Sequence, residues 1–428
     1  MDTIQAPRGT RDFYPAEMAW RNHLMDAWRR VSERNGFEQV DGPIFEKLDL
    51  YKVKSGEGIV SELFSFRRDQ GSTDFAIRPE FTPTLARMVA ARANALPKPI
   101  KWFALPNFCR AERPQRGRLR EFWQWNVDLL GLEGAAADAE VIFTCVDLLA
   151  ELGLRPEHVR VKISHRDVVA EILNTLGVPG DRTADAFSLL DRRDKMEPGA
   201  FEAAAAGLGL DGARLQRFTE VCRQRYRAGS LSSLAKALSL PQPPADLVAL
   251  DKQLHAFGIA DWCEYDLGIV RGLAYYTGTV FEVHEAMGVE RAIAGGGRYD
   301  KLIELFGGPP TPACGFGMGD VVLSNVLSDK KLVPGDVAPR PDAFVFATGD
   351  AEAADVAEVA ARLRRQGLHA RMSYRSTRNV GKLLKEAGSL RSRHAVLVGH
   401  DTLELKDLVT GEQQPVADID TLLARLRS

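Results

Sequence analysis

The densest group of charged side chains in this sequence lies in FCRAERPQRGRLREFWQWNVD, at residues 108–128. Between two strand-like runs, the segment carries arginines at positions 110, 113, 116, 118 and 120. Arginine presents its donors as a planar fork that binds two phosphate or carboxylate oxygens together. Arg110 is therefore a candidate to clamp the α-phosphate of a nucleotide, with Glu112 fixing a neighbouring amine or metal. A solvated basic hairpin without any ligand is the alternative for such a cluster.

The second strand-like run of this segment favours a ligand-binding surface. Gln124 and Asp128 are four residues apart, so both side chains point to the same side of an extended strand. Trp123 and Trp125 would then cover the opposite face. An amide and a carboxylate on the open face of a sheet indicate a surface that recognises a polar ligand.

Two further polar residues lie at a predicted strand-to-helix junction, in AIRPEFTPTLARMV. Thr82 suits the N-cap of the helix that follows, a role that needs no ligand. Glu80 comes one residue after Pro79, between an apolar strand and a helix. A carboxylate at that place would suit an α-ammonium partner, and a plain surface carboxylate is the alternative.

Arg271 is the single cation in the strand-like run GIVRGLAYYTGTVFEV. Glycines at 268 and 272 would let the backbone approach a ligand closely, and a buried charge without an evident partner usually has a function. In a strand, Tyr275 and Tyr276 would point to opposite faces. One of them would then pack in the core and the other would be free to touch a substrate.

Three consecutive glycines precede Arg298 in AIAGGGRYDKLIELFGG. They could form a turn that approaches a phosphate, although a lone triple glycine is more often a tight turn or a β-bulge. Their position after Arg271 along the chain is more informative than the glycines themselves.

The elements that must position these residues predict an α+β domain on a mostly antiparallel sheet. Residues 17–35 place apolar side chains near helical spacing, and Gly36 follows where a C-cap glycine would stand. Short aromatic and β-branched runs predict strands, with helices at 82–94 and 136–153 between them. From about 166 to 260 the chain is charged and alanine-rich with a helical period, which predicts a helical insertion.

A second domain is predicted beyond this one. The first domain would span residues 1–332, and the segment 333–342 contains three prolines without apolar periodicity, which is typical of a linker. Residues 343–428 alternate strand-like and helix-like segments. This alternation predicts a separate α/β domain with parallel strands.

Composition excludes several classes of protein. The 428 residues are 45% hydrophobic and 27% charged, which favours a folded chain of two or three domains. No apolar run reaches the roughly 18 residues of a membrane helix and no secretory h-region follows Met1, so we expect a soluble cytoplasmic protein. The five cysteines are odd in number and lack CxxC spacing, which argues against disulfides and thiolate zinc sites. With a net charge of -2, nucleic acid would have to bind to local basic patches.

Taken together, these segments resemble the histidyl-tRNA synthetase family over nearly the whole chain. RGTRDFYP at residues 8–15 looks like the family's opening, GFEQVDGPIFE resembles class II motif 1, and FCRAERPQRGRLREF looks like motif 2. GIVRGLAYYTG and AGGGRYDKL are similar to two signature peptides that other class II synthetases lack. Residues 343–428 resemble the family's anticodon-binding domain. Five such motifs are not expected in this order by chance.

The resemblance implies a role for individual residues. As implied catalytic residues, Arg110 and Arg271 would stabilise charge on the ATP α-phosphate from opposite sides. The implied histidine-binding residues are Glu80, Phe81, Thr82, Arg110, Gln124, Asp128, Arg271, Tyr275 and Tyr276. The implied ATP-binding residues are Arg110, Glu112 and Arg118, and no residue is assigned to a metal. Asp128 stands where the family usually carries glutamate.

The resemblance also implies the reaction and the partners. The histidine carboxylate would attack the α-phosphate of ATP to give histidyl-adenylate and pyrophosphate. The histidyl group would then pass to the 3′ end of tRNA(His). Mg²⁺ is expected with ATP, and a cytoplasmic homodimer, joined in the family through motif 1, is the expected assembly.

One motif departs from the family. Motif 3 usually reads close to GLERL, and its arginine packs on ATP and contacts the terminal phosphate. Here the corresponding sequence is GMGDVVL, with Val322 at the position of the arginine. No arginine occurs between Arg298 and Arg340. A non-catalytic paralogue that acts as a histidine or tRNA sensor, or as a regulatory subunit, is therefore the alternative. An unrelated nucleotide-binding protein is a more remote one.

Overall fold

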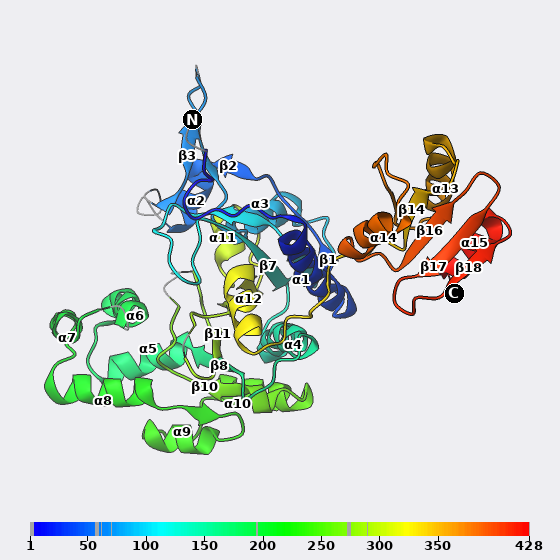
Figure 1. The fold of residues 1–428 in the computed structure, drawn as a ribbon. Coiled ribbons are helices and arrows are strands. Elements are labelled where there is room, and N and C mark those ends of the chain that lie inside the picture. The colour runs from blue at the N-terminus through cyan, green and yellow to red at the C-terminus, as the bar shows by residue number, and fades with distance from the viewer. Residues whose placement is uncertain are drawn as a thin grey trace. The chain divides into compact units, whose positions relative to one another are not determined.

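The computed structural model of this chain describes residues 4–55, 60, 62–69, 71–193, 196–271, 275–288 and 290–427 (Figure 1). The chain divides into two compact units, Met1–Gly335 and Asp336–Ser428. Each unit has its own sheet and its own apolar core. Within the described part of the chain, no helix combines the length and apolar character needed to cross a membrane.

The first unit is built on a ten-stranded sheet, in the order β1-β5-β7-β13-β12-β11-β8-β10-β9, with β6 paired to β7. All neighbours run antiparallel except β1 with β5 and β8 with β10, which confirms the mostly antiparallel α+β fold. The strands are β1 Glu38–Gln39, β5 Ile100–Ala104, β6 Asn107–Cys109, β7 Glu121–Leu130, β8 Val159–His165, β9 Tyr226–Arg227, β10 Cys263–Tyr265, β11 Thr279–Glu285, β12 Ala294–Arg298 and β13 Ala313–Gly319.

One face of this sheet is covered by α1 (Pro15–Arg34), α4 (Ala135–Glu151) and α12 (Asp320–Asp329). The large core between them includes Trp28 of α1 and Trp125 of β7, whose ring centroids lie 6.5 Å apart. The helix predicted at residues 17–35 is α1, and Gly36 follows it with a φ of 77° as the capping pattern indicates. The odd-numbered residues of β7 thus point into the core.

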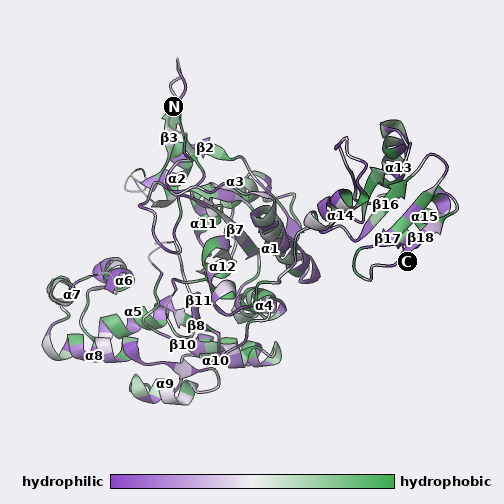
Figure 2. Cartoon of the chain, viewed as in Figure 1, coloured by the Kyte–Doolittle hydropathy of each residue, from purple (hydrophilic) through white to green (hydrophobic). Residues whose placement is uncertain are grey.

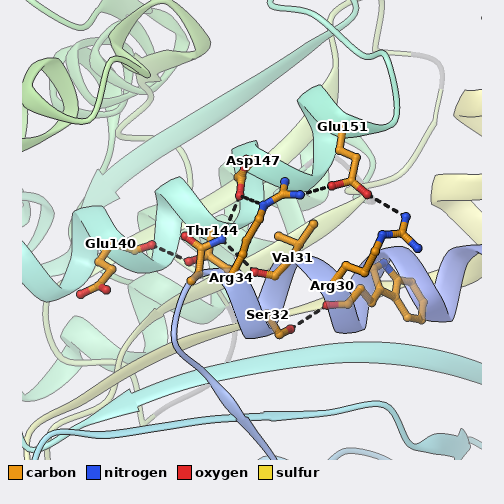
Figure 3. A network of polar contacts seen from close by, with 10 residues as sticks. Arg30, Val31, Ser32, Arg34, Glu140, Thr144, Asp147 and Glu151 are labelled. Atoms are coloured by element: carbon orange, nitrogen blue, oxygen red, sulfur yellow. Dashed lines mark hydrogen bonds and ion pairs between the residues drawn. The ribbon is translucent and has the colours of Figure 1, made fainter.

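Ion pairs on the outside of the core join α1 to α4 (Figure 3). Arg34 Nε lies 2.8 Å from Asp147 Oδ2 and its Nη1 pairs with Glu151, which also binds Arg30 Nη2 at 2.9 Å. Such half-exposed pairs contribute little each, so the buried apolar contacts of α1 dominate the stability of this packing.

The opposite face of the sheet packs on α3 (Thr82–Arg92) and α11 (Leu302–Leu305) through a smaller core. A three-stranded antiparallel sheet has the order β2-β4-β3. Helix α2 (Leu48–Ser55) contacts both this sheet and α3. The strands of this sheet are β2 Phe45–Lys47, β3 Ser65–Arg67 and β4 Asp74–Ile77.

Helices dominate residues 166–262, between β8 and β10. They are α5 Arg166–Thr175, η2 Gly180–Arg182, α6 Thr183–Arg192, α7 Pro198–Ala206, α8 Gly212–Arg223, α9 Leu231–Ala237, α10 Ala245–Ala256 and η4 Ala260–Trp262. The short strand β9 interrupts them and pairs with β10 at the end of the main sheet. The helical segment is therefore anchored to the sheet by β-pairing, which its composition did not indicate.

The prediction of a strand at residues 268–285 is wrong over its first half. Only β11, Thr279–Glu285, is a strand, and residues 272–274 lie outside the described part. Arg271 has a φ of 53°, in the left-handed region that a β-strand does not use. Arg271 therefore stands outside the strand β11.

The second unit has a five-stranded sheet in the order β15-β14-β16-β17-β18, in which β14 runs parallel to both neighbours. The last two pairings are antiparallel. Figure 2 shows both hydrophobic and hydrophilic residues on α13 and α15, as expected of helices that cover a sheet. The elements are β14 Ala343–Ala347, α13 Ala353–Arg365, β15 Ala370–Met372, α14 Val380–Ser389, β16 His394–Val398, β17 Leu403–Asp407, β18 Gln413–Val416 and α15 Ile419–Arg427.

Candidate functional site

A polar pocket lies on the face of the main sheet opposite the large core. It brings together all the predicted histidine-binding residues except Phe81. Its lining residues are Glu80, Thr82, Arg110, Gln124, Asn126, Asp128, Arg271, Tyr275, Tyr276, Gly295, Tyr299, Gly315, Phe316 and Gly317. A larger cavity of about 730 Å³ lies among residues of α7 and α8, and none of the predicted site residues lines it.

Strand β7 supplies three polar side chains to the pocket. Gln124 and Asp128 line it together, as their spacing predicts, while Trp125 is buried in the core behind them. Asn126 lies between them and also lines the pocket. The sequence interpretation missed Asn126, although the same two-residue period places it on that face.

Glycines in the two neighbouring strands make room for the polar side chains. A Cβ on Gly295 of β12 would stand 2.1 Å from Arg271 Nη1, and one on Gly315 of β13 would stand 2.2 Å from Asp128 Oδ1. A Cβ on Gly317 would meet the Gln124 amide at 2.7 Å. Each distance is shorter than a real Cβ contact, so these glycines form a flat floor beneath the site.

Gly295–Gly297 form neither of the structures considered from the sequence, a phosphate-approach turn or a tight turn or bulge. These residues lie in the middle of β12, paired with β11 and β13 on both sides. Arg298, which follows them, is buried and pairs with Asp138 at 2.6 Å and Asp300 at 3.0 Å. The triple glycine therefore shapes the pocket floor, and Arg298 holds the fold together.

Arg271 reaches the pocket from a strained backbone position. A φ of 53° costs a non-glycine residue about 1 kcal/mol or more, and such strain is kept where the surroundings fix it. Arg166 Nη1 donates to the carbonyls of Val270 and Arg271 at 3.0 and 3.1 Å. The backbone that presents Arg271 is thus held by Arg166, which is buried.

Glu282 is the partner of Arg271 that sequence reasoning missed. Arg271 Nη1 lies 2.6 Å from Glu282 Oε1, and His284 Nε2 lies 2.7 Å from the other carboxylate oxygen. Burial raises the pKa of Glu282, but the hydrogen bond from His284 and the charge of Arg271 outweigh it and lower the pKa to about 2. Arg271 is therefore paired, and Glu282 stays ionised at neutral pH.

The prediction that Tyr275 and Tyr276 point to opposite faces is wrong. Both line the pocket, with ring centroids 4.7 Å apart and planes tilted by 36°. The two-residue alternation does not apply because they stand in a turn before β11. Tyr299 packs edge-on against Tyr275 at 6.0 Å and completes an aromatic wall.

Asp128 is buried at the end of this wall. Its Oδ1 accepts a hydrogen bond from the Tyr299 hydroxyl. Burial raises the pKa of Asp128 to about 7, although the hydrogen bond from Tyr299 works in the opposite direction. This carboxyl therefore changes its protonation state near neutral pH. Tyr299 follows the glycine-rich strand, and nothing in the local pattern singled it out.

Arg110 and the β4–α3 junction close another side of the pocket. Arg110 Nε donates to the Pro79 carbonyl at 3.0 Å, and its guanidinium lies 5.2 Å from the centroid of the Phe122 ring. The prediction that Thr82 is the N-cap of α3 is wrong. Phe81 takes that position and Thr82 lines the pocket. The Phe81 side chain is fully buried in the smaller core, which gives it a packing role.

Glu112 and Arg118 lie in the loop between β6 and β7, outside the pocket lining. Arg118 Nη1 pairs with Glu112 Oε1 at 2.6 Å. The second carboxylate oxygen, Oε2, is buried without a hydrogen-bond partner among the described residues. An unsatisfied buried oxygen beside an arginine is suited to a cation or a donor brought by a ligand.

Comparison with known proteins matches each of the two units to a family model. A family model described as histidyl-tRNA synthetase matches residues 9–320, and one described as an anticodon-binding domain matches 342–428. The histidine–tRNA ligase of Natronomonas pharaonis is 39% identical over 419 residues, which cover 96% of this chain and 95% of that protein.

Two solved structures show the same fold. The histidyl-tRNA synthetase of Nostoc sp. PCC 7120 aligns with a TM-score of 0.80 at 22% identity, covering 100% of this chain and 99% of that one. A Bacillus halodurans protein described as an ATP phosphoribosyltransferase regulatory subunit/histidyl-tRNA synthetase aligns with a TM-score of 0.73 at 20% identity. It covers 93% of this chain and 99% of its own.

Proposed function

The chain belongs to the histidyl-tRNA synthetase family, and from that premise we propose how its pocket activates histidine. As a class II histidine–tRNA ligase, it activates L-histidine with ATP and esterifies it to tRNA(His). Full-length similarity to ligases in archaea, bacteria and plants favours this activity over the role of a non-catalytic paralogue. The observation that carries the proposal is one pocket that gathers residues from six separate segments of the chain.

In this proposal, different parts of the pocket bind the α-ammonium group and the imidazole of histidine. Glu80 accepts the α-ammonium group beside the Arg110 hairpin. Gln124, Asp128 and the aromatic wall hold the imidazole, because a carboxylate that titrates near neutral pH can accept a ring N–H. The glycine floor lets the ring lie close to the sheet.

Arg110 and Arg271 act on the α-phosphate from two sides. A histidine carboxylate oxygen forms a bond to the α-phosphorus, while the bond to the β-phosphate breaks and pyrophosphate leaves. Negative charge builds on the α-phosphate in this step, and two fixed cations stabilise it without reorganising. Glu282 and Arg166 hold Arg271 in place before substrate arrives.

Mg²⁺ is proposed to come with ATP. In the described part of the chain, no three acidic, histidine or cysteine side chains gather into a metal site. Magnesium bound to a nucleotide commonly takes only one or two carboxylates, with phosphates and water completing its shell. The unpartnered Oε2 of Glu112 suits that role.

A homodimer is proposed to form through the three-stranded sheet, whose first strand β2 begins at the end of motif 1. Phe45 and Phe66 are 48% and 42% exposed, and their rings pack together and on Phe75 at 5.7–5.9 Å. Ile44 and Phe64, which stand next to these strands in the sequence, are also exposed. A cluster of exposed aromatic side chains marks a protein interface better than scattered ones do.

We expect the Phe45→Ser/Phe66→Ser double variant to elute as a monomer near 47.2 kDa, whereas the unmodified protein has about twice that mass. Light scattering coupled to gel filtration measures the difference. Tyr374→Ser, at an isolated aromatic residue that is 83% exposed, is the control and leaves the mass unchanged. A double variant that stays dimeric contradicts the assignment of this surface.

We further propose that the protein works in the cytoplasm. All five cysteines are free thiols, and Cys145, Cys222, Cys263 and Cys314 are buried. Free buried thiols are typical of a reducing compartment.

Histidine-dependent exchange of labelled pyrophosphate into ATP tests the proposed function. We expect exchange with histidine and none without it. A folded protein that binds histidine but shows no exchange would instead be a sensor or regulatory paralogue.

Deletion of the second unit after Gly335 separates activation from recognition of tRNA. The pocket lies wholly within the first unit, so we expect pyrophosphate exchange to change less than about threefold. Charging of tRNA(His) should fall about tenfold to a hundredfold, since each lost base contact costs about 1–3 kcal/mol. Circular dichroism checks that the shortened chain is folded. Unchanged charging would contradict an anticodon-binding role for the second unit.

A further inference from the structure

The place of the family's motif 3 arginine is apolar in this protein. Val322 lies in the first turn of α12 and is 7% exposed, packed in the large core. Its neighbour Asp320 is also buried and pairs with Arg11 at 2.7 Å. The helix itself therefore offers no cation to the terminal phosphates of ATP.

The loop between β6 and β7 brings another arginine to this place. Gly117, at the tip of the loop, faces both α12 and the segment before β12. A Cβ at Gly117 would lie 3.3 Å from Val322 Cγ2, 3.5 Å from Glu290 Oε2 and 3.7 Å from Arg291 Cδ. Arg291 therefore stands beside the position that Val322 leaves without charge.

Three contacts fix the segment that carries Arg291. Glu290 is buried and accepts from Arg116 Nε of the loop at 2.5 Å. Asn325, one turn after Val322 on α12, lies 3.5 Å from the other oxygen of Glu290. Arg116 also reaches Asp329 of the same helix at 3.1 Å. Loop, segment and helix are thereby tied together around residue 291.

Most other arginines nearby are already engaged. Arg11 is paired with Asp320, Arg116 with Glu290 and Asp329, and Arg118 with Glu112. Arg291 forms no hydrogen bond or ion pair with any residue that the structure describes. It is half-buried, which distinguishes it from the exposed Arg113 at the start of the loop.

The surroundings of Arg291 are those of an anion site. Burial and the nearby charge of Arg118 lower the pKa of Arg291, and Glu112 raises it only in part. Two neighbouring guanidinium groups repel each other unless an anion lies between them. Arg118 and Glu112 are also two of the three residues predicted to bind ATP.

We propose that Arg291 binds the terminal phosphates of ATP and so replaces the missing motif 3 arginine. The proposal rests on the proposed function of the pocket, because it presumes that ATP binds along the β6–β7 loop. It adds a specific substrate-binding residue from the segment before β12. The charge is thus supplied from the segment that leads into β12 and not from helix α12.

Binding of ATP and AMP to Arg291→Ala, measured by titration calorimetry, tests this assignment. A charge-assisted contact to a phosphate is worth about 1.5–3 kcal/mol, so we expect ATP affinity to fall about tenfold to a hundredfold. AMP lacks the terminal phosphates, so its affinity should change less than about twofold. Arg291→Lys keeps the positive charge but loses the planar guanidinium fork. Its ATP affinity should therefore lie between those of the unmodified protein and Arg291→Ala.

Two controls make the outcome decisive. Arg155→Ala removes an exposed arginine in the turn between α4 and β8 and should alter neither affinity. Thermal unfolding without ligand checks that the Arg291 variants remain folded. Equal losses for ATP and AMP would show that Arg291 only positions the loop, and unchanged ATP affinity would also overturn the proposal. Failure of the unmodified protein to bind ATP would instead contradict the proposed function.

Discussion

Arg271→Gln is expected to lower the rate of histidine-dependent pyrophosphate exchange by about a thousandfold. One lost donor to a developing charge costs about 100- to 1,000-fold, and this variant also loses the cation itself. Glutamine keeps a polar side chain of similar reach next to Glu282. Initial rates at saturating ATP and histidine measure the effect, which should appear in kcat more than in KM because the contact strengthens in the transition state.

Gly295→Ala tests the same contact without touching the arginine. The added Cβ would stand 2.1 Å from Arg271 Nη1, so the guanidinium must move away from its place above β12. We therefore expect a loss of exchange that approaches that of Arg271→Gln. Gly388→Ala, in α14 of the second unit where a Cβ meets nothing within 4 Å, is the matched control. Exchange within threefold of the unmodified rate in either pocket variant would remove Arg271 from the catalytic step.

Local period alone predicts part of the site, and the family motifs supply most of the other pocket residues. Gln124 and Asp128 follow from the alternation of β7, since a strand places every second residue on one face. The end of α1 and the elements of the second unit follow from capping and hydrophobic patterning in the same way.

The remaining parts depend on contacts between distant segments. Tyr299 and Asp128 are separated by 171 positions along the chain, and β12 brings them together only through the pairing of β13 with β7. Glu282 was missed because its strand was predicted to begin before Arg271. The error arose because an arginine gives no sign of a positive φ, whereas a glycine would have done so.

Asp128→Asn is expected to stabilise the protein above neutral pH while weakening its affinity for histidine. Burial raises the pKa of Asp128 from 3.8 to about 7. Between these values the folded protein keeps a proton that the unfolded chain releases, so the free energy of unfolding falls as the pH rises. About three pH units at about 1.4 kcal/mol each give a cost of at most about 4 kcal/mol at pH 8. The amide has no such cost, and its oxygen can still accept from Tyr299.

Denaturant titrations of both proteins at pH 4.5 and pH 8 separate this effect from a general change in packing. The stability gained by Asp128→Asn should be small at pH 4.5, where Asp128 is protonated in the folded state, and largest at pH 8. Asp261→Asn, at an exposed aspartate in η4, should show no gain that grows with pH. Histidine affinity should fall about tenfold to a hundredfold with the loss of a charged acceptor. An equal gain in the free energy of unfolding at both pH values would mean that the Asp128 carboxyl is ionised at both. Its contact with the imidazole would then not depend on pH in this range.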